Sequence, residues 1–93
     1  MKAYDGEGML EKRMEVRPSH LEGMKVLGKQ IIVAGGLLDE EGTMKGSALV
    51  MEFENRAALD KYLESEPYVV ENVWQKIEVA PMNVVLVNGE KRA

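Results

Sequence analysis

Residues 30–38 read Gln-Ile-Ile-Val-Ala-Gly-Gly-Leu-Leu, an almost wholly apolar run that is rich in β-forming side chains. This composition predicts a β-strand that is covered on both faces. Residues 39–42, Asp-Glu-Glu-Gly, are typical of a hairpin loop, and residues 46–54 predict the strand that follows it. The centre of the chain is therefore expected to be an antiparallel hairpin.

One helix is expected before this hairpin and one after it. Residues 9–27 carry apolar side chains at helical spacing, and Pro18 inside the pattern predicts a kink or a division. Residues 56–65 predict a short second helix. Asn55 suits its start because the side chain accepts from free backbone N–H groups, and Pro67 requires an end before it.

Strands are expected near both ends of the chain. Residues 73–80 alternate in polarity and predict a half-buried strand, with Trp74 on its outer side. Residues 1–5 predict a first strand that is short enough to look curtailed, and residues 81–93 predict an extension that forms an edge strand or a partner-binding arm. The order βαββαβ predicts an α+β, ferredoxin-like fold with helices on one face of an antiparallel sheet.

Composition excludes several classes of protein. Ninety-three residues, 45% hydrophobic and 30% charged, predict a single folded domain over residues 1–93. A formal charge of −4 argues against nucleic-acid binding through a basic face, and no apolar run is long enough to span a membrane. The chain has no cysteine and one histidine, so we expect a cytoplasmic protein without a disulfide, zinc site or cofactor.

Three basic side chains lie on the apolar side of the first predicted helix. Arg13, Arg17 and His20 have the spacing i, i+4, i+7, which places them in one line. Buried charge is costly unless it is paired, so each needs a carboxylate, a group of carbonyls or an anionic ligand. A structural interpretation makes His20 a core histidine. The arginines then form salt bridges, for example to Glu52, Glu54 or Glu66.

The alternative interpretation is a small pocket between this helix and the sheet. His20 is then a general acid and base, and an arginine binds a carboxylate or a developing oxyanion. Such a histidine needs a carboxylate to fix its tautomer, and the candidates are Asp39 and Glu66.

The strands also carry apolar side chains on both faces, which leaves one face of the sheet without a cover. A second copy of the chain is the expected cover, because a contiguous apolar patch usually marks an interface. The sequence therefore predicts a homodimer with its sheets face to face.

Several short motifs follow one another over residues 10–69. They are Leu10-Glu11-x-Arg13, Arg17-Pro18-x-His20-Leu21, Ala34-Gly35-x-Leu37-Leu38-Asp39, Gly46-Ser47 and Glu66-Pro67-Tyr68-Val69. In this order they resemble the YCII-related (YciI-like) family. The resemblance implies a dimeric α+β-barrel and a histidine–aspartate pair as the active site, with His20 as the histidine. The family's Asp-Pro-Tyr is replaced here by Glu66-Pro67-Tyr68, and its Ala-Gly-Pro by Ala34-Gly35-Gly36.

These features predict an enzyme that catalyses proton transfer, isomerisation or elimination, with a small anionic or cyclic organic molecule as its substrate. The predicted catalytic residues are His20, Glu66 and Asp39, and the predicted substrate-binding residues are Arg13, Arg17, Ser47 and Tyr68. The alternative is a non-catalytic dimeric domain that binds a metabolite in the same pocket. A third interpretation makes the basic line wholly structural.

Overall fold

A computed structural model describes residues 1–92 and shows an α+β fold on a four-stranded antiparallel sheet. The elements along the chain are β1 (Lys2–Asp5), α1 (Leu10–Leu27), a 3₁₀ turn (Gly28–Gln30), β2 (Ile31–Leu38), β3 (Met44–Met51), α2 (Arg56–Ser65), α3 (Pro67–Val70), β4 (Trp74–Glu78), β5 (Leu86–Val87) and β6 (Glu90–Lys91). Among residues 1–92, no helix has the length and apolar character needed to cross a membrane.

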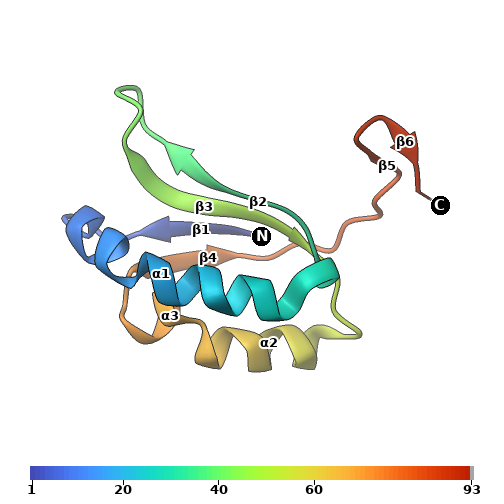
Figure 1. The fold of residues 1–93 in the computed structure, drawn as a ribbon, viewed down its shortest axis with the longest axis horizontal. Coiled ribbons are helices and arrows are strands. Elements are labelled where there is room, and N and C mark those ends of the chain that lie inside the picture. Colours follow the sequence, from blue (N-terminus) through green and yellow to red (C-terminus); the bar gives the residue numbers. More distant parts are fainter. Residues whose placement is uncertain (93) are drawn as a thin grey trace.

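The sheet has the strand order β2-β3-β1-β4, and every neighbouring pair is antiparallel. The helices lie together on one face of this sheet, as Figure 1 shows. The short first strand lies in the middle of the sheet, between β3 and β4, and not at an edge. The predicted ferredoxin-like α+β fold is therefore confirmed.

α1 is one continuous helix, although Pro18 lies inside it. The loss of one N–H does not divide the helix, because the turns on both sides of Pro18 remain helical. The helix ends at Leu27, and the following residue, Gly28, has a positive φ of 54°, a backbone conformation suited to glycine. Of the two outcomes predicted for Pro18, a division of the helix is thus wrong.

Local side-chain chemistry sets the ends of the two following helices. The Asn55 side chain accepts a hydrogen bond from the Ala58 N–H at 2.9 Å, and α2 begins at the next residue, as predicted. The short α3 was not predicted. It begins at Pro67, and the preceding residue, Glu66, caps it by accepting from the Tyr68 N–H at 3.2 Å. This cap places Glu66 beneath α1.

The core lies between the helices and the sheet. It consists of Ala3, Val16, Leu49, Tyr68, Val73 and Trp74. The predicted outward position of Trp74 is wrong, since its exposed fraction is only 3%. The register between β1 and β4 shifts between Tyr4 and Asp5, and this irregularity breaks the simple alternation of inner and outer side chains.

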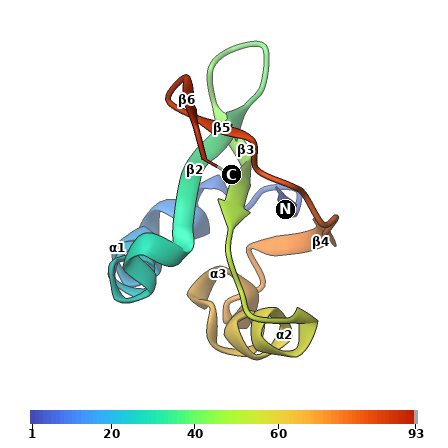
Figure 2. The same ribbon diagram turned by 90° about the vertical axis from the view of Figure 1, so that its right-hand side faces the viewer.

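Two further sequence expectations concern β2 and the C-terminal extension. β2 was expected to be covered on both faces, with a second copy of the chain as the cover; in the single chain Val33 is 59% exposed and residues 33–36 are all exposed, so this expectation stays a prediction. Residues 81–92 do not add an edge strand to the sheet. They carry the separate β5–β6 hairpin, which projects from the body in Figure 1 and faces the viewer in Figure 2. An ion pair between Arg92 and Glu52 connects the end of this hairpin to the segment after β3. Ala93, the last residue of the expected extension, lies outside the described residues.

Candidate functional site

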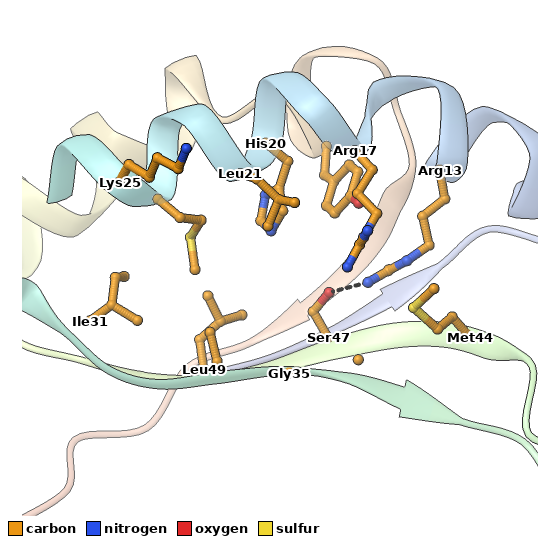
Figure 3. A pocket seen from close by; sticks show the side chains of 14 residues that line it. Arg13, Arg17, His20, Leu21, Lys25, Ile31, Gly35, Met44, Ser47 and Leu49 are labelled. Atoms are coloured by element: carbon orange, nitrogen blue, oxygen red, sulfur yellow. Dashed lines mark hydrogen bonds between the residues drawn. The ribbon is translucent and has the colours of Figure 1, made fainter. Parts of the chain in front are cut away.

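A cavity of about 460 Å³ separates α1 from strands β2 and β3. Figure 3 shows the side chains of α1 pointing into it from one side, with Ser47, Leu49 and Gly35 of the sheet on the other. The lining includes the cations Arg13, Arg17 and Lys25, the imidazole of His20, and no carboxylate. In a chain whose formal charge is −4, this is a local concentration of positive charge.

Part of the apolar face of α1 is not buried. Leu10, Met14 and Leu21 are apolar residues of this helix, yet they are 43%, 47% and 41% exposed, and of the three Leu21 lines the cavity. The helix contacts the core through a narrower line that contains Val16, and it stands away from β2 on its other side. The three basic residues predicted to lie in one line on this helix therefore differ in their burial.

Arg13 and His20 are buried, with exposed fractions of 4% and 7%. Arg17, which was expected to share their buried side, is exposed at the cavity and lines it. Of the three basic side chains in the predicted line, two are thus held inside the protein. The third, Arg17, is the one whose side chain is exposed.

His20 forms a hydrogen-bonded pair with Glu66. Its Nδ1 lies 2.6 Å from Glu66 Oε1, and the carboxylate side chain is fully buried. Because a carboxylate accepts, this contact places the imidazole proton on Nδ1 and leaves Nε2 for a ligand in the cavity that His20 lines. The ring stacks on Tyr68 with a centroid separation of 4.1 Å and meets Trp74 edge-on at 5.7 Å.

Glu66 also accepts two hydrogen bonds from other groups. The Tyr68 N–H donates to Oε1 at 3.2 Å, and the Tyr62 hydroxyl donates to Oε2. Burial, together with the charge and hydrogen bond of Glu66, raises the pKa of Tyr62 well above its usual value. The phenol therefore remains a donor throughout the neutral range.

Arg13 belongs to a second buried network. Its Nη1 donates to both oxygens of Asp5 at 3.0 and 3.1 Å, and its Nη2 donates to Ser47 Oγ at 2.9 Å. Burial raises the pKa of Asp5, and the Arg13 charge opposes this effect. The guanidinium also lies 4.9 Å from the centroid of the Tyr68 ring. The expected arginine pairs with Glu52, Glu54 or Glu66 are wrong, because Asp5 neutralises Arg13 instead.

The hydrogen-bonding role of the Ser47 hydroxyl is fixed by this network. Its Oγ accepts from Arg13 Nη2 and from Trp74 Nε1, which lies 3.2 Å away. A hydroxyl has two lone pairs and one hydrogen, so both acceptor positions are used and the hydrogen is left to donate. Ser47 lines the cavity, where it can offer that hydrogen to an acceptor on a ligand.

Arg17 and Tyr68 complete the polar end of the cavity. No ion pair within residues 1–92 involves Arg17. Burial raises the pKa of Tyr68, although the nearby charges of Arg13 and Arg17 oppose the change. Arg17 is therefore the arginine whose charge is available to an anion, and Tyr68 is a neutral phenol beside it.

Asp39 lies in the turn between β2 and β3. Its Oδ1 accepts from the backbone N–H groups of Glu41 and Thr43 at 2.9 and 3.0 Å. Of the two carboxylates proposed as partners of His20, the structure thus brings Glu66 to the imidazole and places Asp39 in the hairpin. A catalytic role for Asp39 stays a prediction.

Three contributors to this site were not found from the sequence. Tyr62 precedes Glu66 by four residues, a spacing that was available as a signal for contact across a helical turn. Asp5 and Trp74 reach the site through the β1–β4 pairing, which no local pattern announces. Within residues 1–92, no group of three or more His, Asp or Glu side chains is arranged to hold a metal ion.

Comparison with known proteins gives consistent matches. Residues 1–83 match the YCII-related domain family, which confirms the resemblance drawn from the sequence. Protein YciI of Escherichia coli O6:H1 is 31% identical over 91 residues, and the alignment covers 89% of this chain and 93% of that protein. An uncharacterized protein of Haemophilus influenzae is 32% identical with the same coverage.

A solved structure has the same fold. It is the 5-chloro-2-hydroxyhydroquinone dehydrochlorinase TftG of Burkholderia phenoliruptrix, in complex with 2,5-dihydroxybenzoquinone. The TM-score is 0.82 at 24% identity, and the superposition covers 88% of this chain and 89% of TftG.

Proposed function

We propose that this chain, which belongs to the YCII-related family, is a small-molecule enzyme whose His20–Glu66 pair transfers a proton within the α1–β2–β3 cavity. The observation that carries the proposal is the 2.6 Å contact between His20 Nδ1 and a fully buried carboxylate. A carboxylate in this position orients the imidazole and stabilises the imidazolium that forms when Nε2 accepts a proton.

The charges around the cavity support an anionic substrate. Asp5 neutralises Arg13, whereas Arg17 has no ion-pair partner within residues 1–92. Arg17 is therefore proposed to bind a carboxylate, phenolate or enolate oxygen, and the Ser47 hydroxyl donates to the same group. Leu49 and Ile31, farther along the lining, provide an apolar surface for the body of the ligand.

The proposed reaction begins with removal of an acidic proton from the substrate by His20 Nε2. Electrons from the broken bond move onto the adjacent oxygen, where Arg17 and Ser47 stabilise the developing negative charge. The imidazolium then returns the proton to another atom of the substrate, which is an isomerisation. Alternatively, the electrons expel an anionic leaving group and the imidazolium releases its proton to that group or to water, which is an elimination. The fold of TftG, whose name describes a dehydrochlorinase acting on a hydroxylated ring, supports cyclic oxygen-rich anions as candidates.

Isotope exchange tests this proposal before the natural substrate is identified. Small carboxylates, lactones and 2,5-dihydroxybenzoquinone are incubated in D₂O with the protein, and deuterium at acidic C–H positions is followed by NMR. We expect exchange with at least one compound, and we expect His20→Gln to slow it by about 10²–10⁴-fold. Equal binding to wild type and His20→Gln without any exchange would instead identify the non-catalytic metabolite-binding domain.

The proposal includes a homodimer with its sheets face to face. Antiparallel pairing opposes Val33 to Val50 on the face away from the helices, and this face is uncovered in the single chain (Figure 1). Leu86, in the hairpin that follows the family match, is also 60% exposed. Sedimentation velocity at micromolar concentration is expected to show a dimer for wild type and a monomer for Val33→Glu. A monomeric wild type would refute this arrangement.

A further inference from the structure

The geometry points to Tyr62 as a positioning residue, which holds the Glu66 carboxylate in the orientation that fixes the proton of His20 on Nδ1. This inference rests on the proposed function of the His20–Glu66 pair. It assigns Tyr62 no contact with the substrate. Its role is to keep Nε2 of His20 free as the base.

The three hydrogen bonds to Glu66 are unevenly divided between the two carboxylate oxygens. His20 Nδ1 and the Tyr68 N–H both lie at Oε1, at 2.6 and 3.2 Å, whereas Tyr62 donates to Oε2. The side chain of Glu66 is fully buried, so no solvent replaces a lost donor without rearrangement. Removal of the Tyr62 hydroxyl therefore leaves a buried anionic oxygen unsatisfied, which is costly.

A glutamate needs this support more than a shorter carboxylate does. Its side chain has three rotatable bonds. Hydrogen bonds to Oε1 alone leave the carboxylate free to turn about the last of these bonds. A turned carboxylate can reach the Tyr62 side of the pocket and release His20. Alternatively, the unsatisfied oxygen takes up a proton, and the pair is then protonated at a higher pH. Both responses change the imidazole.

Tyr62 is itself well fixed for this role. It lies in the last turn of α2, four residues before Glu66, and its ring stacks against Phe53 with a centroid separation of 5.6 Å. Its hydroxyl oxygen is also 3.9 Å from Met24 Sδ, a weak acceptor compared with a carboxylate. Because burial and the Glu66 charge raise the pKa of Tyr62, the hydroxyl keeps its hydrogen at neutral pH.

Other charged and titratable groups surround the pair from every adjoining element. α1 contributes Arg13 and Arg17, α3 contributes Tyr68, and β1 contributes Asp5 behind Arg13. No hydrogen bond links these side chains to Glu66 Oε2 among residues 1–92, whereas the Tyr62 hydroxyl makes one. A change in Tyr62 is thus expected to act on the pair through that one bond.

The single histidine of the chain makes the test direct, because its imidazole nitrogens give the only such signals in a long-range ¹H–¹⁵N spectrum. We expect wild type to show the Nδ1–H tautomer. Tyr62→Phe keeps the ring and its stacking, and we expect mixed tautomers and a titration midpoint about one pH unit higher. Tyr4→Phe is the matched control. Tyr4 lies on β1 against Lys76, so His20 should be unchanged.

Glu66→Gln separates this inference from the proposed function. If Glu66→Gln alters the tautomer and midpoint but Tyr62→Phe leaves both at the wild-type values, the inference is overturned and the proposed pair stands. If neither variant changes His20, the pair itself is refuted. Should Tyr62→Phe fail to fold, wild type still provides a test. Its Tyr62 hydroxyl proton should give a protected downfield signal that disappears in Glu66→Gln, and absence of that signal in wild type would overturn the inference.

Discussion

Replacement of Ser47 by alanine should destabilise the protein by more than the loss of one small hydroxyl suggests. The side-chain oxygen accepts from Arg13 Nη2 at 2.9 Å and from Trp74 Nε1 at 3.2 Å, and Ser47 is only 4% exposed. Ser47→Ala therefore leaves two buried donors without a partner. One such donor costs about 1–3 kcal/mol, and a charged donor lies at the upper end of that range.

Water in the adjoining cavity can occupy part of the vacated space and recover one of these hydrogen bonds. The expected loss in the free energy of unfolding is therefore about 2 kcal/mol, less than the sum of two unsatisfied donors. Urea denaturation followed by circular dichroism measures it as a lower midpoint with an unchanged slope. Ser65→Ala is the matched control, because Ser65 is exposed on α2 and its change should stay within about 0.5 kcal/mol.

A double-mutant cycle then tests the reasoning. In a Trp74→Phe background one of the two donors is already absent, so Ser47→Ala should cost less than it does in wild type. A loss below about 0.5 kcal/mol for Ser47→Ala alone, or strict additivity with Trp74→Phe, would show that Ser47 Oγ does not join the two networks.

Two further predictions concern Arg17 and the tyrosines. Arg17→Gln should weaken the binding of 2,5-dihydroxybenzoquinone about tenfold or more in calorimetry, because it removes a charged donor. The same change should alter the free energy of unfolding by less than about 0.5 kcal/mol. A large loss of stability with unchanged binding would show that Arg17 has a structural role. The pKa values of all three tyrosines are raised above their ordinary value, so the native protein at pH 10 should show less tyrosinate absorbance at 295 nm than the urea-unfolded protein. A tyrosine whose pKa is raised in the folded state stabilises the protein at a pH below the pKa it has in the unfolded state. This contribution to the free energy of unfolding is lost as the pH rises above that unfolded-state pKa. The urea concentration at the unfolding midpoint should therefore decrease as the pH is raised beyond 10, and it should decrease less steeply in Tyr62→Phe. An equally steep decrease in that variant would contradict the raised pKa of Tyr62.

Local signals in the sequence predicted the elements whose ends are set by neighbouring residues. α2 begins after Asn55 and ends before Pro67 as expected, because a side-chain cap and a proline act over a few residues. α3 was missed because it has four residues and no period to detect. The face of Trp74 was predicted wrongly because it depends on a register shift in the β1–β4 pairing, which involves residues about seventy positions apart.

The line of Arg13, Arg17 and His20 shows the same limit at the site. Its spacing correctly placed two of these side chains inside the protein, but a helical wheel assumes that the whole apolar sector contacts the sheet. α1 instead stands away from β2, and all three side chains line the resulting cavity, with Arg13 and His20 buried and Arg17 exposed. Which carboxylate pairs with which basic group depends on tertiary contacts of this kind, so the sequence left Asp39 and Glu66 as equal candidates for His20.

The carboxylate partners of Arg13 and His20 limit what the cavity can bind. Asp5 neutralises the charge of Arg13, and Glu66 accepts the hydrogen bond from His20 Nδ1, so both buried basic groups are already paired with a carboxylate before any ligand enters. Neither is free to attract an anion on its own. Of the two arginines, Arg17 is left to attract an anion, while His20 Nε2 and the Ser47 hydroxyl supply one acceptor and one donor in the same cavity. A substrate that matches all three must carry an anionic oxygen and an acidic hydrogen close together, which is the arrangement found in enolisable carbonyl compounds and hydroxylated quinones.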